Sequence, residues 1–494
     1  MKPSAFLAFD LGASGGRGIL GELHGGKLSL REVSRFPNGM LSVRGHLHWN
    51  IFNLFERIKE GIHICARERV PDSVGIDTWG VDFGLLARDG CILGLPFAYR
   101  DSRTDGAMES FFKKVPQKRV YELTGIQFLP LNTLFQLESM VRDTSPLLEL
   151  ATDLLFIPDL LNYLLSGAKK TEFTFASTSQ LYNPIKGGWE NELLAALGLP
   201  LSLMQEIVPP GSVIGAISHD VSQEIGIPEL PVIAVATHDT GSAVAAAPAE
   251  GDDWAYISSG TWSLMGIETK APIITSESMR LNFTNEGGVG RTFRFLKNIA
   301  GLWLLQECRR AWDQDKSLSY DDLLESAQTA RPFSALIDPD WPEFLNPPDM
   351  PEAIRAACKR TAQEPPASRG EFVRCILESL ALKYRFVLDQ LRRISPLPIN
   401  RIHVIGGGAR NRLLCQFTAD ATGIPIFAGP VEATAIGNIM VQALSYGRVS
   451  SLAEMRDVIR RSFDVVTYLP DQTTQWNRAY ERFYDVLGNA GDRP

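Results

Sequence analysis

An aspartate and an arginine flank a glycine-rich stretch near the start of the chain, Asp10-Leu11-Gly12-Ala13-Ser14-Gly15-Gly16-Arg17. The apolar run before Asp10 predicts a strand, so the carboxylate would end that strand and the glycines would turn the chain. Backbone N–H groups of such turns bind phosphate oxygens, and Arg17 would add positive charge. Asp10 would hold Mg²⁺ through water, because hard cations prefer oxygen ligands. A plain hairpin with a turn-favouring aspartate is the alternative.

A second acidic residue lies at a predicted strand-to-helix junction, within Ala236-Thr237-His238-Asp239-Thr240-Gly241-Ser242-Ala243. A carboxylate placed there is able to accept the proton of an alcohol that attacks a phosphoryl group, so Asp239 is a candidate general base. The alternative is a helix N-cap, whose carboxylate accepts from helix N–H groups. His238 is better suited to a structural or substrate hydrogen bond than to the role of base.

Two further turns carry groups that suit a nucleotide. Ser258-Ser259-Gly260-Thr261-Trp262-Ser263 offers hydroxyl and N–H groups to β- and γ-phosphates, and its alternative is an ordinary β-turn. Gly406-Gly407-Gly408-Ala409-Arg410-Asn411 lets a flat ligand such as adenine approach the backbone closely. Its alternative is a flexible turn.

Two loops combine aspartate, arginine and tryptophan, as a site for a polyhydroxylated ligand does. They are Gly75-Ile76-Asp77-Thr78-Trp79-Gly80-Val81-Asp82-Phe83 and Tyr99-Arg100-Asp101-Ser102-Arg103. Carboxylate and guanidinium groups bind hydroxyls, and an aromatic face stacks on a sugar ring. The alternative is a loop held by its own ion pairs under a tryptophan.

Two common motifs match by accident. Gly16 to Gly21 fits the dinucleotide fingerprint, but that motif opens a helix, and here a second turn follows. Gly12 to Gly16 fits the serine-hydrolase elbow, which also needs a helix after the turn. No P-loop pattern and no paired Cys/His set for zinc occurs in the sequence.

The elements that position these motifs alternate between strands and helices, which is typical of an α/β protein. Strands are predicted at 7–10, 18–23, 73–77, 231–236, 254–258, 262–267 and 401–405. Helices are predicted at 53–67, 147–167, 239–247, 370–391 and from 411 onward. Asp10-Leu11-Gly12 and Ser258-Ser259-Gly260 are 248 positions apart, so each half of the chain would begin with a glycine-turned hairpin.

Composition excludes several classes of protein. The 494 residues carry a net charge of −8, which argues against a general nucleic-acid binder because phosphate backbones attract clustered Lys and Arg. Asp10 interrupts the apolar start too early for a signal peptide, and no apolar stretch reads as a membrane span. Six scattered cysteines without C-x-x-C spacing predict a reduced, cytoplasmic protein.

The order of the motifs resembles that of the FGGY family of carbohydrate kinases, which belongs to the superfamily of sugar kinases, heat-shock protein 70 and actin. Further segments that match are Gly125 to Pro130, Thr284 to Gly288, Lys297 to Ile299, Gly301 to Gln306, and Ala428 to Ala433.

The resemblance implies an α/β protein of two ribonuclease-H-like domains, of the actin-like ATPase or hexokinase type, flanking a catalytic cleft. The implied domains are 1–245, which binds sugar, and 246–465, which binds ATP. A C-terminal helical segment, 466–494, follows these domains, and one arrangement has it pack back on the first domain. The implied reaction is phosphorylation of L-rhamnulose at O1 by MgATP, with small molecules as partners, no nucleic acid or membrane, and a monomer or homodimer as the assembly.

The resemblance also assigns roles by position. Asp239 would accept the proton, and Asp10 would organise Mg²⁺ through water. The residues that would contact ATP are Ala13, Ser14, Gly15, Gly16, Arg17, Thr261, Gln306 and Gly407. The residues that would contact the sugar are Gly80, His238, Asp239, Thr240 and Asn298. A cysteine pair of some members falls here on Thr418 and Thr422, whereas Cys358 and Cys375 match another pairing.

Other functions stay open at this point. One is a kinase for another ketose, such as L-fuculose or a xylulose, because a single hydrogen bond in the pocket decides such a choice. A non-catalytic sugar or nucleotide sensor would lack part of the set Asp10, Arg17, Asp239 and Thr261, which is complete here. An actin-like polymer former would scatter light as filaments with ATP, and we expect none.

Overall fold

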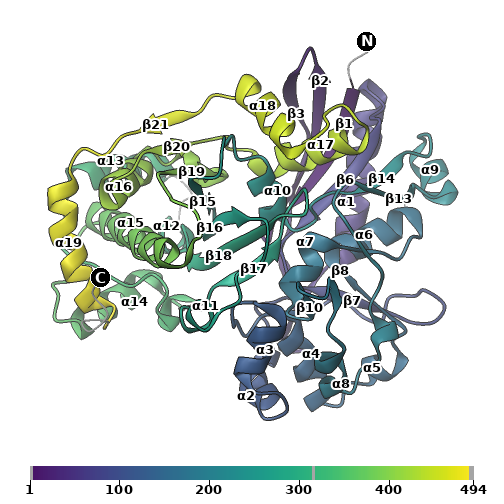
Figure 1. The fold of residues 1–494 in the computed structure, drawn as a ribbon, viewed down its shortest axis with the longest axis horizontal. Coiled ribbons are helices and arrows are strands. Elements are labelled where there is room, and N and C mark those ends of the chain that lie inside the picture. The colour runs from purple at the N-terminus through teal and green to yellow at the C-terminus, as the bar shows by residue number, and fades with distance from the viewer. Residues whose placement is uncertain (1–3, 314–317, 489–494) are drawn as a thin grey trace. The chain divides into compact units, whose positions relative to one another are not determined.

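The computed structural model describes residues 4–313 and 318–488, which form two compact units. Unit 1 comprises Met1–Glu250, Glu268–Leu296 and Glu432–Phe463, and unit 2 comprises Gly251–Ile267, Lys297–Val431 and Asp464–Pro494. Each unit contains a β-sheet with helices beside it (Figure 1). The boundaries 1–245, 246–465 and 466–494 stay a prediction.

The sheet of unit 1 has the strand order β13-β14-β6-β1-β2-β3. Its strands are β1 (Ser4–Leu11), β2 (Gly15–His24), β3 (Lys27–Pro37), β6 (Ser73–Thr78), β13 (Ser212–Ala216) and β14 (Pro231–Ala234). The predicted first hairpin is confirmed, because β1 and β2 pair antiparallel, while β6 lies parallel to β1. Strand β2 runs without a break through the glycines, so neither the dinucleotide fingerprint nor the hydrolase elbow has the helix that it needs.

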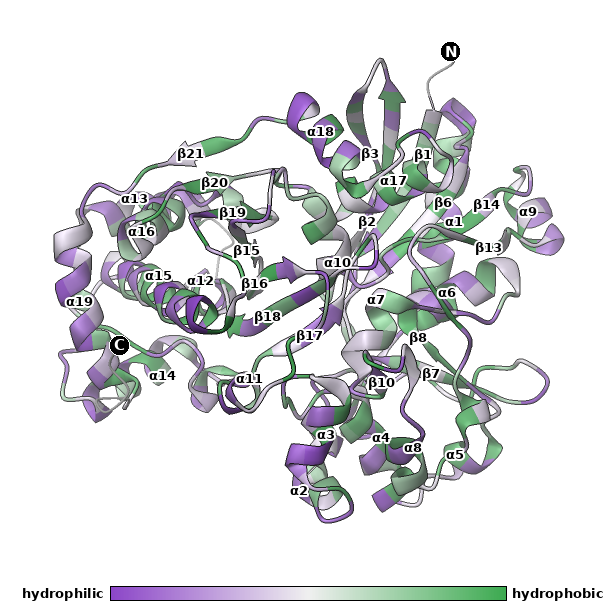
Figure 2. Ribbon diagram, viewed as in Figure 1, coloured by the Kyte–Doolittle hydropathy of each residue, from purple (hydrophilic) through white to green (hydrophobic). Residues whose placement is uncertain are grey.

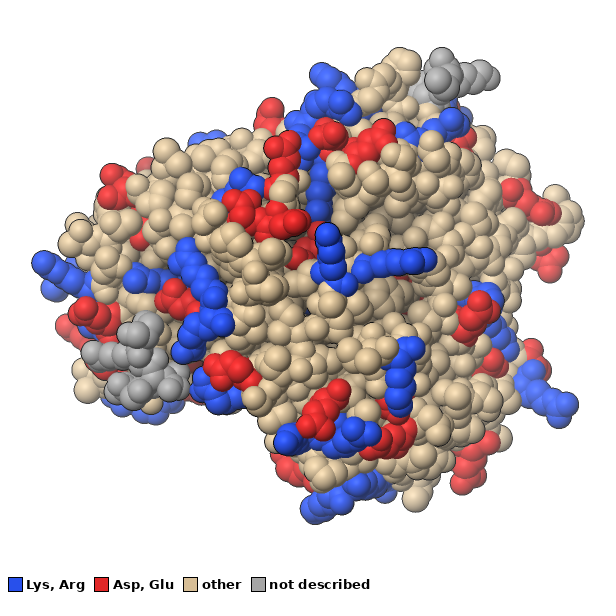
Figure 3. All heavy atoms as spheres, viewed as in Figure 1, with Lys and Arg blue, Asp and Glu red and all other residues tan. Residues whose placement is uncertain are grey.

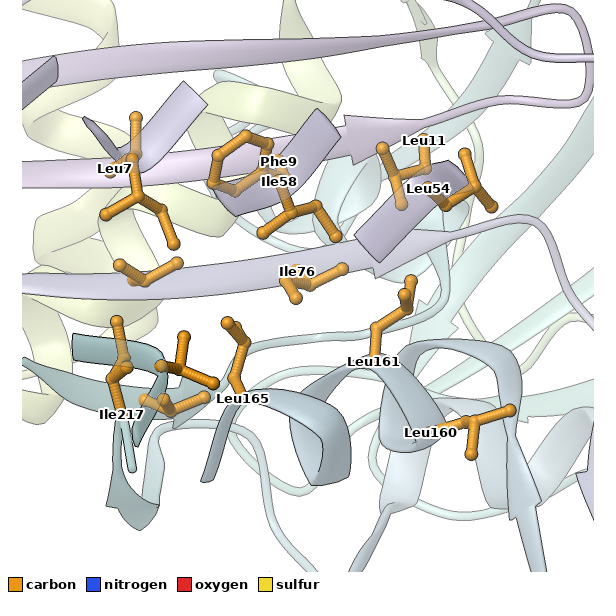
Figure 4. Packing of buried hydrophobic residues seen from close by; sticks show 14 of the residues in the cluster. Leu7, Phe9, Leu11, Leu54, Ile58, Ile76, Leu160, Leu161, Leu165 and Ile217 are labelled. Atoms are coloured by element: carbon orange, nitrogen blue, oxygen red, sulfur yellow. The ribbon is translucent and has the colours of Figure 1, made fainter. Parts of the chain in front are cut away.

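Helices cover both faces of this sheet. They are α1 (Ile51–Glu68), α6 (Ile157–Ser166), α9 (His219–Ile225), α10 (Asp239–Ala245), α17 (Ala433–Ser445) and α18 (Leu452–Ser462). Successive side chains of a strand point to opposite faces. Leu7, Phe9 and Leu11 therefore share one core cluster with residues of α1 and α6, such as Ile58 and Leu161 (Figure 4).

The opposite face of the sheet lies against α17. Gln442 of this helix donates to the backbone carbonyl of Leu7, and the ring of Phe6 meets that of Tyr446 edge-on. A side chain at Gly75 would collide with Asn438 and Gln442, so the helix needs a glycine on β6 to approach this closely. Helix α10, which carries Asp239, packs on α17 in turn.

The rest of unit 1 is built from short elements, many of which pack around a second core cluster that includes Phe83, Phe135 and Phe156. The helices are α2 (Ala107–Phe112), α3 (Gln117–Thr124), α4 (Thr133–Arg142), α5 (Pro146–Leu150), α7 (Phe173–Ala176), α8 (Asn191–Leu197) and α11 (Ser276–Arg280). The strands are β4 (Met40–Val43), β5 (His46–Trp49), β7 (Phe83–Leu86), β8 (Asp153–Phe156), β9 (Thr171–Glu172), β10 (Tyr182–Asn183), β11 (Gly188–Trp189), β12 (Ile207–Val208) and β17 (Thr284–Gly287), with the first half of β18 (Phe293–Ala300).

The prediction of one helix over 147–167 is wrong. The segment holds the short helix α5, the strand β8 and then α6. Strand β8 pairs antiparallel with β7, and its last three residues are fully buried. A continuous apolar run has no period that separates a buried strand from a helix. Pro158, in the first turn of α6, marks where the helix begins.

In unit 2, the strands β16 (Trp262–Thr269), β15 (Trp254–Ser259), β19 (Arg401–Ile405), β20 (Ile426–Ala428) and β21 (Val466–Tyr468) adjoin in this order. Its helices are α12 (Trp303–Trp312), α13 (Tyr320–Thr329), α14 (Met350–Arg360), α15 (Arg369–Ile394), α16 (Arg412–Thr422) and α19 (Thr473–Val486). Figure 2 shows α15 banded with apolar and hydrophilic residues. Ser368 and Glu371 begin this helix with a capping box.

Each sheet contains a glycine-turned antiparallel hairpin whose first strand pairs in parallel with a later strand. In unit 1 these are β1, β2 and β6, and in unit 2 they are β15, β16 and β19. The repeat of Asp10-Leu11-Gly12 as Ser258-Ser259-Gly260 therefore marks equivalent turns in the two sheets.

The surface carries charges of both signs, and Figure 3 shows them interspersed on the face that it displays. None of the helices within the described residues is both long enough and apolar enough to cross a bilayer. All six cysteines are free thiols, including the buried Cys358 and Cys375.

Buried Glu378 on α15 gives unit 2 a predicted pH dependence. Burial outweighs the attraction of Arg374 and raises the pKa of Glu378 to about 7, above the value of about 4.3 for an unfolded chain. The folded state therefore holds the proton more tightly. This contribution to stability is present in full below pH ~4 and is lost as pH rises through ~7, by about 3 kcal/mol.

The Glu378→Gln variant, which cannot titrate, should lose much less stability than the wild type between pH 5 and pH 8. Urea unfolding at the two pH values measures this difference. Glu481→Gln, which changes an exposed residue of α19, is the control and should follow the wild type. An equal pH dependence in Glu378→Gln and wild type contradicts the prediction.

Candidate active site

Asp10 is the second-last residue of β1 and lies opposite Arg17 in the β1–β2 hairpin. Arg17 Nη2 donates to Asp10 Oδ2 over 2.7 Å, and Arg17 Nη1 donates to Glu432 Oε2. Burial raises the pKa of Asp10, Arg17 lowers it, and Asp239 and Glu432 raise it again, so the pKa lies above its ordinary value. The predicted phosphate-binding arginine is thus held in place by two carboxylates.

A third carboxylate, Asp77, lies beside Asp10 on the neighbouring parallel strand. It is fully buried, and Asn438 Nδ2 of α17 donates to its Oδ2 over 2.6 Å. Burial and the charges of Asp10 and Asp239 raise the pKa of Asp77 well above its ordinary value, against the hydrogen bond from Asn438. Asp10, Asp77 and Asp239 therefore lie within one electrostatic cluster.

The turn between β1 and β2 is tight and depends on glycine. Gly12 N donates to Gly15 O over 2.9 Å, and Asn38 Nδ2 donates to Gly12 O over 2.8 Å. A β-carbon on Gly16 would come within 2.6 Å of the ring of Phe36. Ser14 at the tip is exposed, so the side and tip of this turn are accessible to a ligand.

Asp239 is the first residue of α10, and one third of its side chain is exposed. Its Oδ1 accepts from Thr240 N over 2.5 Å and from Thr240 Oγ1 over 3.1 Å. The N-cap residue of α10 is His238, so Asp239 does not cap the helix from the N-cap position as the alternative supposed.

The backbone before Asp239 is fixed by Glu172, which the sequence analysis did not single out. The buried carboxylate accepts from both N and Oγ1 of Thr237, over 3.0 and 2.9 Å. It also accepts from Thr174, whose Oγ1 accepts from His238 N over 3.2 Å. The turn that carries Asp239 is therefore anchored in the core of unit 1.

Four of the five residues predicted to contact the sugar lie together. Thr78, at the end of β6, forms a bridge with His238, and a β-carbon on Gly80 would lie 3.2 Å from His238 Nε2. Asp239 and Thr240 follow in the chain. Any side chain at Gly80 would therefore crowd the imidazole next to the candidate base.

The fifth predicted sugar contact, Asn298, lies on the half of β18 that belongs to unit 2. Its neighbour Lys297 is packed near Lys383 and Gln390. Burial lowers the pKa of Lys297 to about 8, and the nearby Lys383 ammonium adds to that shift.

Three predicted ATP contacts of unit 2 surround its glycine hairpin. Thr261 Oγ1 donates to Gln306 Oε1 over 3.4 Å. The turn with Gly407, the 3₁₀ helix η5 (Gly407–Arg410), packs on the same hairpin, because a β-carbon on Gly408 would lie 2.0 Å from Ser259 Oγ. Nothing lies within 4 Å of a β-carbon built on Gly407, so this residue faces open space.

Two of the three carboxylates in the loops proposed for a polyhydroxylated ligand serve the protein itself. Asp82 Oδ2 accepts from the indole N–H groups of Trp49 and Trp79, over 2.6 and 2.9 Å. Asp101 accepts from the backbone N–H groups of Leu47 and Arg103. Asp82 and Asp101 therefore have a structural role, but N–H donors hold them rather than the ion pairs that the alternative named.

Two residues of the cluster were given no role from the sequence. Asn438 and Glu432 lie more than 350 positions from the residues that they contact. No motif marked Asn438, and Glu432 lay in the matching segment Ala428 to Ala433 without a role assigned to it. Asp77 was noted, but as a sugar contact rather than as a neighbour of Asp10.

Models of the FGGY family of carbohydrate kinases match most of the chain, with the N-terminal domain at residues 5–246 and the C-terminal domain at 255–446. A rhamnulokinase of Bacteroides thetaiotaomicron is 51% identical over 98% of this chain and 99% of its own length. A rhamnulokinase of Bacillus subtilis is 41% identical over 94% of this chain and 95% of its own length.

Two solved structures are similar over almost the whole chain. A gluconate kinase from Lactobacillus acidophilus has a TM-score of 0.81 at 16% identity and covers 99% of both chains. A Plasmodium falciparum glycerol kinase with ADP has a TM-score of 0.76 at 15% identity and covers 100% of this chain and 99% of its own. These structures confirm the predicted two-domain α/β fold, and the family models and relatives confirm the resemblance: the chain belongs to the FGGY family of carbohydrate kinases.

Proposed function

We propose that this protein transfers the γ-phosphoryl group of ATP to O1 of L-rhamnulose, which yields L-rhamnulose 1-phosphate and ADP in the breakdown of L-rhamnose. The bond from O1 to the γ-phosphorus forms while the bond from that phosphorus to the β–γ bridging oxygen breaks. The proton of the O1 hydroxyl passes to Asp239, and the bridging oxygen leaves with ADP. The family supplies the kinase chemistry, and the choice of sugar follows relatives named rhamnulokinase.

The position of Asp239 carries the proposal. It begins a helix beside Gly80 and His238. The neighbouring polar side chain of Thr174 accepts from the backbone N–H of His238 and so holds this turn in place. Its charge also raises the pKa of both Asp10 and Asp77. A partly exposed carboxylate whose charge reaches the aspartate beside a glycine turn is suited to take a proton as an alcohol attacks a bound phosphate.

The nucleotide contacts follow from the two glycine hairpins. We assign Ala13, Ser14, Gly15, Gly16 and Arg17 to the phosphates, because backbone N–H groups in such turns bind phosphate oxygens. We also assign Thr261, Gln306 and Gly407 as ATP contacts, and residues 246–465 as the ATP-binding domain. Gly80, His238, Thr240 and Asn298 would contact the sugar. We place the reaction in the cytoplasm.

Mg²⁺ would lie beside Asp10. The fit rests on charge, since a cation would be stabilised among Asp10, Asp77 and Asp239, and Asp77 Oδ1 is buried without a hydrogen-bond partner in the described part of the chain. No three ligands within the described residues are arranged to hold a metal directly, so Asp10 would hold the ion through water. When bound, Mg²⁺ neutralises charge on the phosphate oxygens.

A coupled assay of ADP release tests the sugar. The purified chain is given MgATP and, in separate reactions, L-rhamnulose, L-fuculose, a xylulose or no sugar. We expect the highest kcat/KM on L-rhamnulose and no ADP release above background without sugar. Turnover on other ketoses but not on L-rhamnulose would contradict L-rhamnulose as the substrate, and it would leave the membership of the kinase family unaffected.

A further inference from the structure

A chain of buried charged side chains leads to Asp239. Glu286 of β17 and Arg294 of β18 face each other across an antiparallel pair, so their side chains lie on the same face. Arg294 Nη2 is 3.1 Å from His238 Nδ1 and 3.1 Å from Glu286 Oε2. The other ring nitrogen, His238 Nε2, is 3.4 Å from Asp239 Oδ1.

Glu286 balances a charge that is expensive to bury. The side chain of Arg294 is 0% exposed, and an uncompensated charge in that position costs several kcal/mol. Arg294 Nε also donates to Gly287 O over 2.8 Å, which fixes the plane of the guanidinium. Burial alone would raise the pKa of Glu286, but the charge of Arg294 is the largest opposing cause, and the pKa lies below its ordinary value. Glu286 is therefore the anion that neutralises Arg294.

The contacts decide which ring nitrogen of His238 carries the proton. Guanidinium groups only donate, so the nitrogen that faces Arg294 must accept. Glu286 Oε2 also lies 3.3 Å from Nδ1, but it takes no hydrogen bond from the described residues, whereas the 3.1 Å Arg294–His238 contact has hydrogen-bond geometry. With Nδ1 as acceptor, a neutral imidazole carries its proton on Nε2. The opposite tautomer would aim a bare lone pair at an oxygen of Asp239.

This proton makes the two oxygens of Asp239 different. Oδ1 receives Thr240 N and Thr240 Oγ1 and faces the Nε2–H of His238. Every hydrogen bond and ion pair that the described part of the chain makes to this carboxylate ends on Oδ1. Oδ2 keeps its lone pairs for a ligand, and a third of the side chain is exposed.

We infer that Glu286 and Arg294 are positioning residues that fix the Nε2–H tautomer of His238, which holds Asp239 Oδ1 and leaves Oδ2 to take the proton of the acceptor alcohol. The role of Oδ2 rests on the proposed function, whereas the tautomer does not. The charged groups that face the imidazole are Glu286 of β17, Arg294 of β18 and Asp239 of α10.

The tautomer is tested on the full chain labelled with ¹⁵N-histidine, without ligands. A two-dimensional ¹H–¹⁵N spectrum of the imidazoles distinguishes a protonated from an unprotonated nitrogen, and the signals of His238 are those lost in His238→Asn. We expect Nε2–H and a bare Nδ1 in the wild type. In Arg294→Met we expect a proton on Nδ1, because Glu286 is then its only partner.

Arg456→Met is the matched control. It removes another largely buried arginine of unit 1, which pairs with Glu268 and donates to Val244 O of α10. We expect this variant to keep the wild-type imidazole signals. If Arg294→Met does not fold, Glu286→Gln tests the same chain, since it removes the anion that neutralises Arg294 and should disturb the Arg294–His238 contact and the signals of His238.

Kinetics supply the second readout. Arg294→Met and Glu286→Gln should lower kcat by about 10²-fold through misplacement of the base, with KM for ATP unchanged, and Arg294→Lys should recover part of the loss. A proton on Nδ1 in the wild type, or imidazole signals unchanged in Arg294→Met, would overturn the inference. The expected tautomer in a chain that phosphorylates no sugar would instead refute the proposed function alone.

Discussion

Replacing Asp239 with asparagine is expected to lower kcat by about 10²–10⁴-fold while nucleotide binding stays nearly intact. The amide keeps an oxygen that accepts from Thr240 N, so the turn should keep its shape. It cannot take a proton from the alcohol at neutral pH. Phosphoryl transfer through a loose transition state depends mainly on positioning and charge, so a residual rate should remain. Steady-state kinetics and ADP titration of the purified variant measure the two effects.

Asp220→Asn is the control for that variant. Asp220 lies in the first turn of α9, a helix of seven residues like α10, but its side chain is exposed. Removing its charge should leave kcat and KM at the wild-type values. Normal turnover in Asp239→Asn would exclude the carboxylate as the base, and a joint loss of ADP binding and activity would point to a damaged fold instead.

The turns were predictable from sequence because their chemistry is local. The hairpin β1–β2 is determined by an apolar strand, a glycine run and a second apolar strand, all between Ser4 and His24. The same holds for β15–β16 and for the junction at Asp239. A local pattern predicts the backbone conformation near a motif. It also predicts that motif residues adjacent in the sequence are close in space.

The partners of the motif residues were not predictable in this way. Asp77 meets Asn438 across 361 positions, and Arg17 meets Glu432 across 415. These contacts exist because α17, far along the chain, returns to pack on the first sheet of unit 1. The periodicity of a single sequence does not indicate that a helix packs on a sheet formed hundreds of residues earlier. Glu172 and Arg294 were missed because their partners, Thr237 and His238, lie more than 50 positions away, and Glu286 lay in the matching segment Thr284 to Gly288 without a role assigned to it.

Sequence patterns also did not predict which residues are buried on all sides. The failure over 147–167 came from a run that is apolar on every side, where strand and helix look alike. Asp82 and Asp101 look like ligand-binding carboxylates in sequence, yet backbone and indole N–H groups use them. A polar residue in a loop is a binding residue only if the fold leaves its acceptors free.

The tight contact between α10 and α17 leads to the second large effect, in Gly437→Ala. Alanine in the middle of a helix usually stabilises it by about 1 kcal/mol relative to glycine. Here the new β-carbon would lie 1.8 Å from Ser242 O and 2.5 Å from Ser242 C, both backbone atoms of α10. Neither can rotate away, so the helices must separate, and overpacking of this kind costs about 3 kcal/mol.

We therefore expect Gly437→Ala to lower the midpoint of urea unfolding, opposite in sign to the helix-propensity effect. It should also lower kcat, because α10 carries Asp239 at its first turn. Gly188→Ala is the control, since nothing lies within 4 Å of its β-carbon and its backbone is not left-handed. A stabilised Gly437→Ala would mean that the helices do not meet at this glycine. A variant that loses stability but keeps the wild-type kcat would mean that Asp239 keeps its position when α10 moves. The position of the base would then not depend on the packing of α10 against α17.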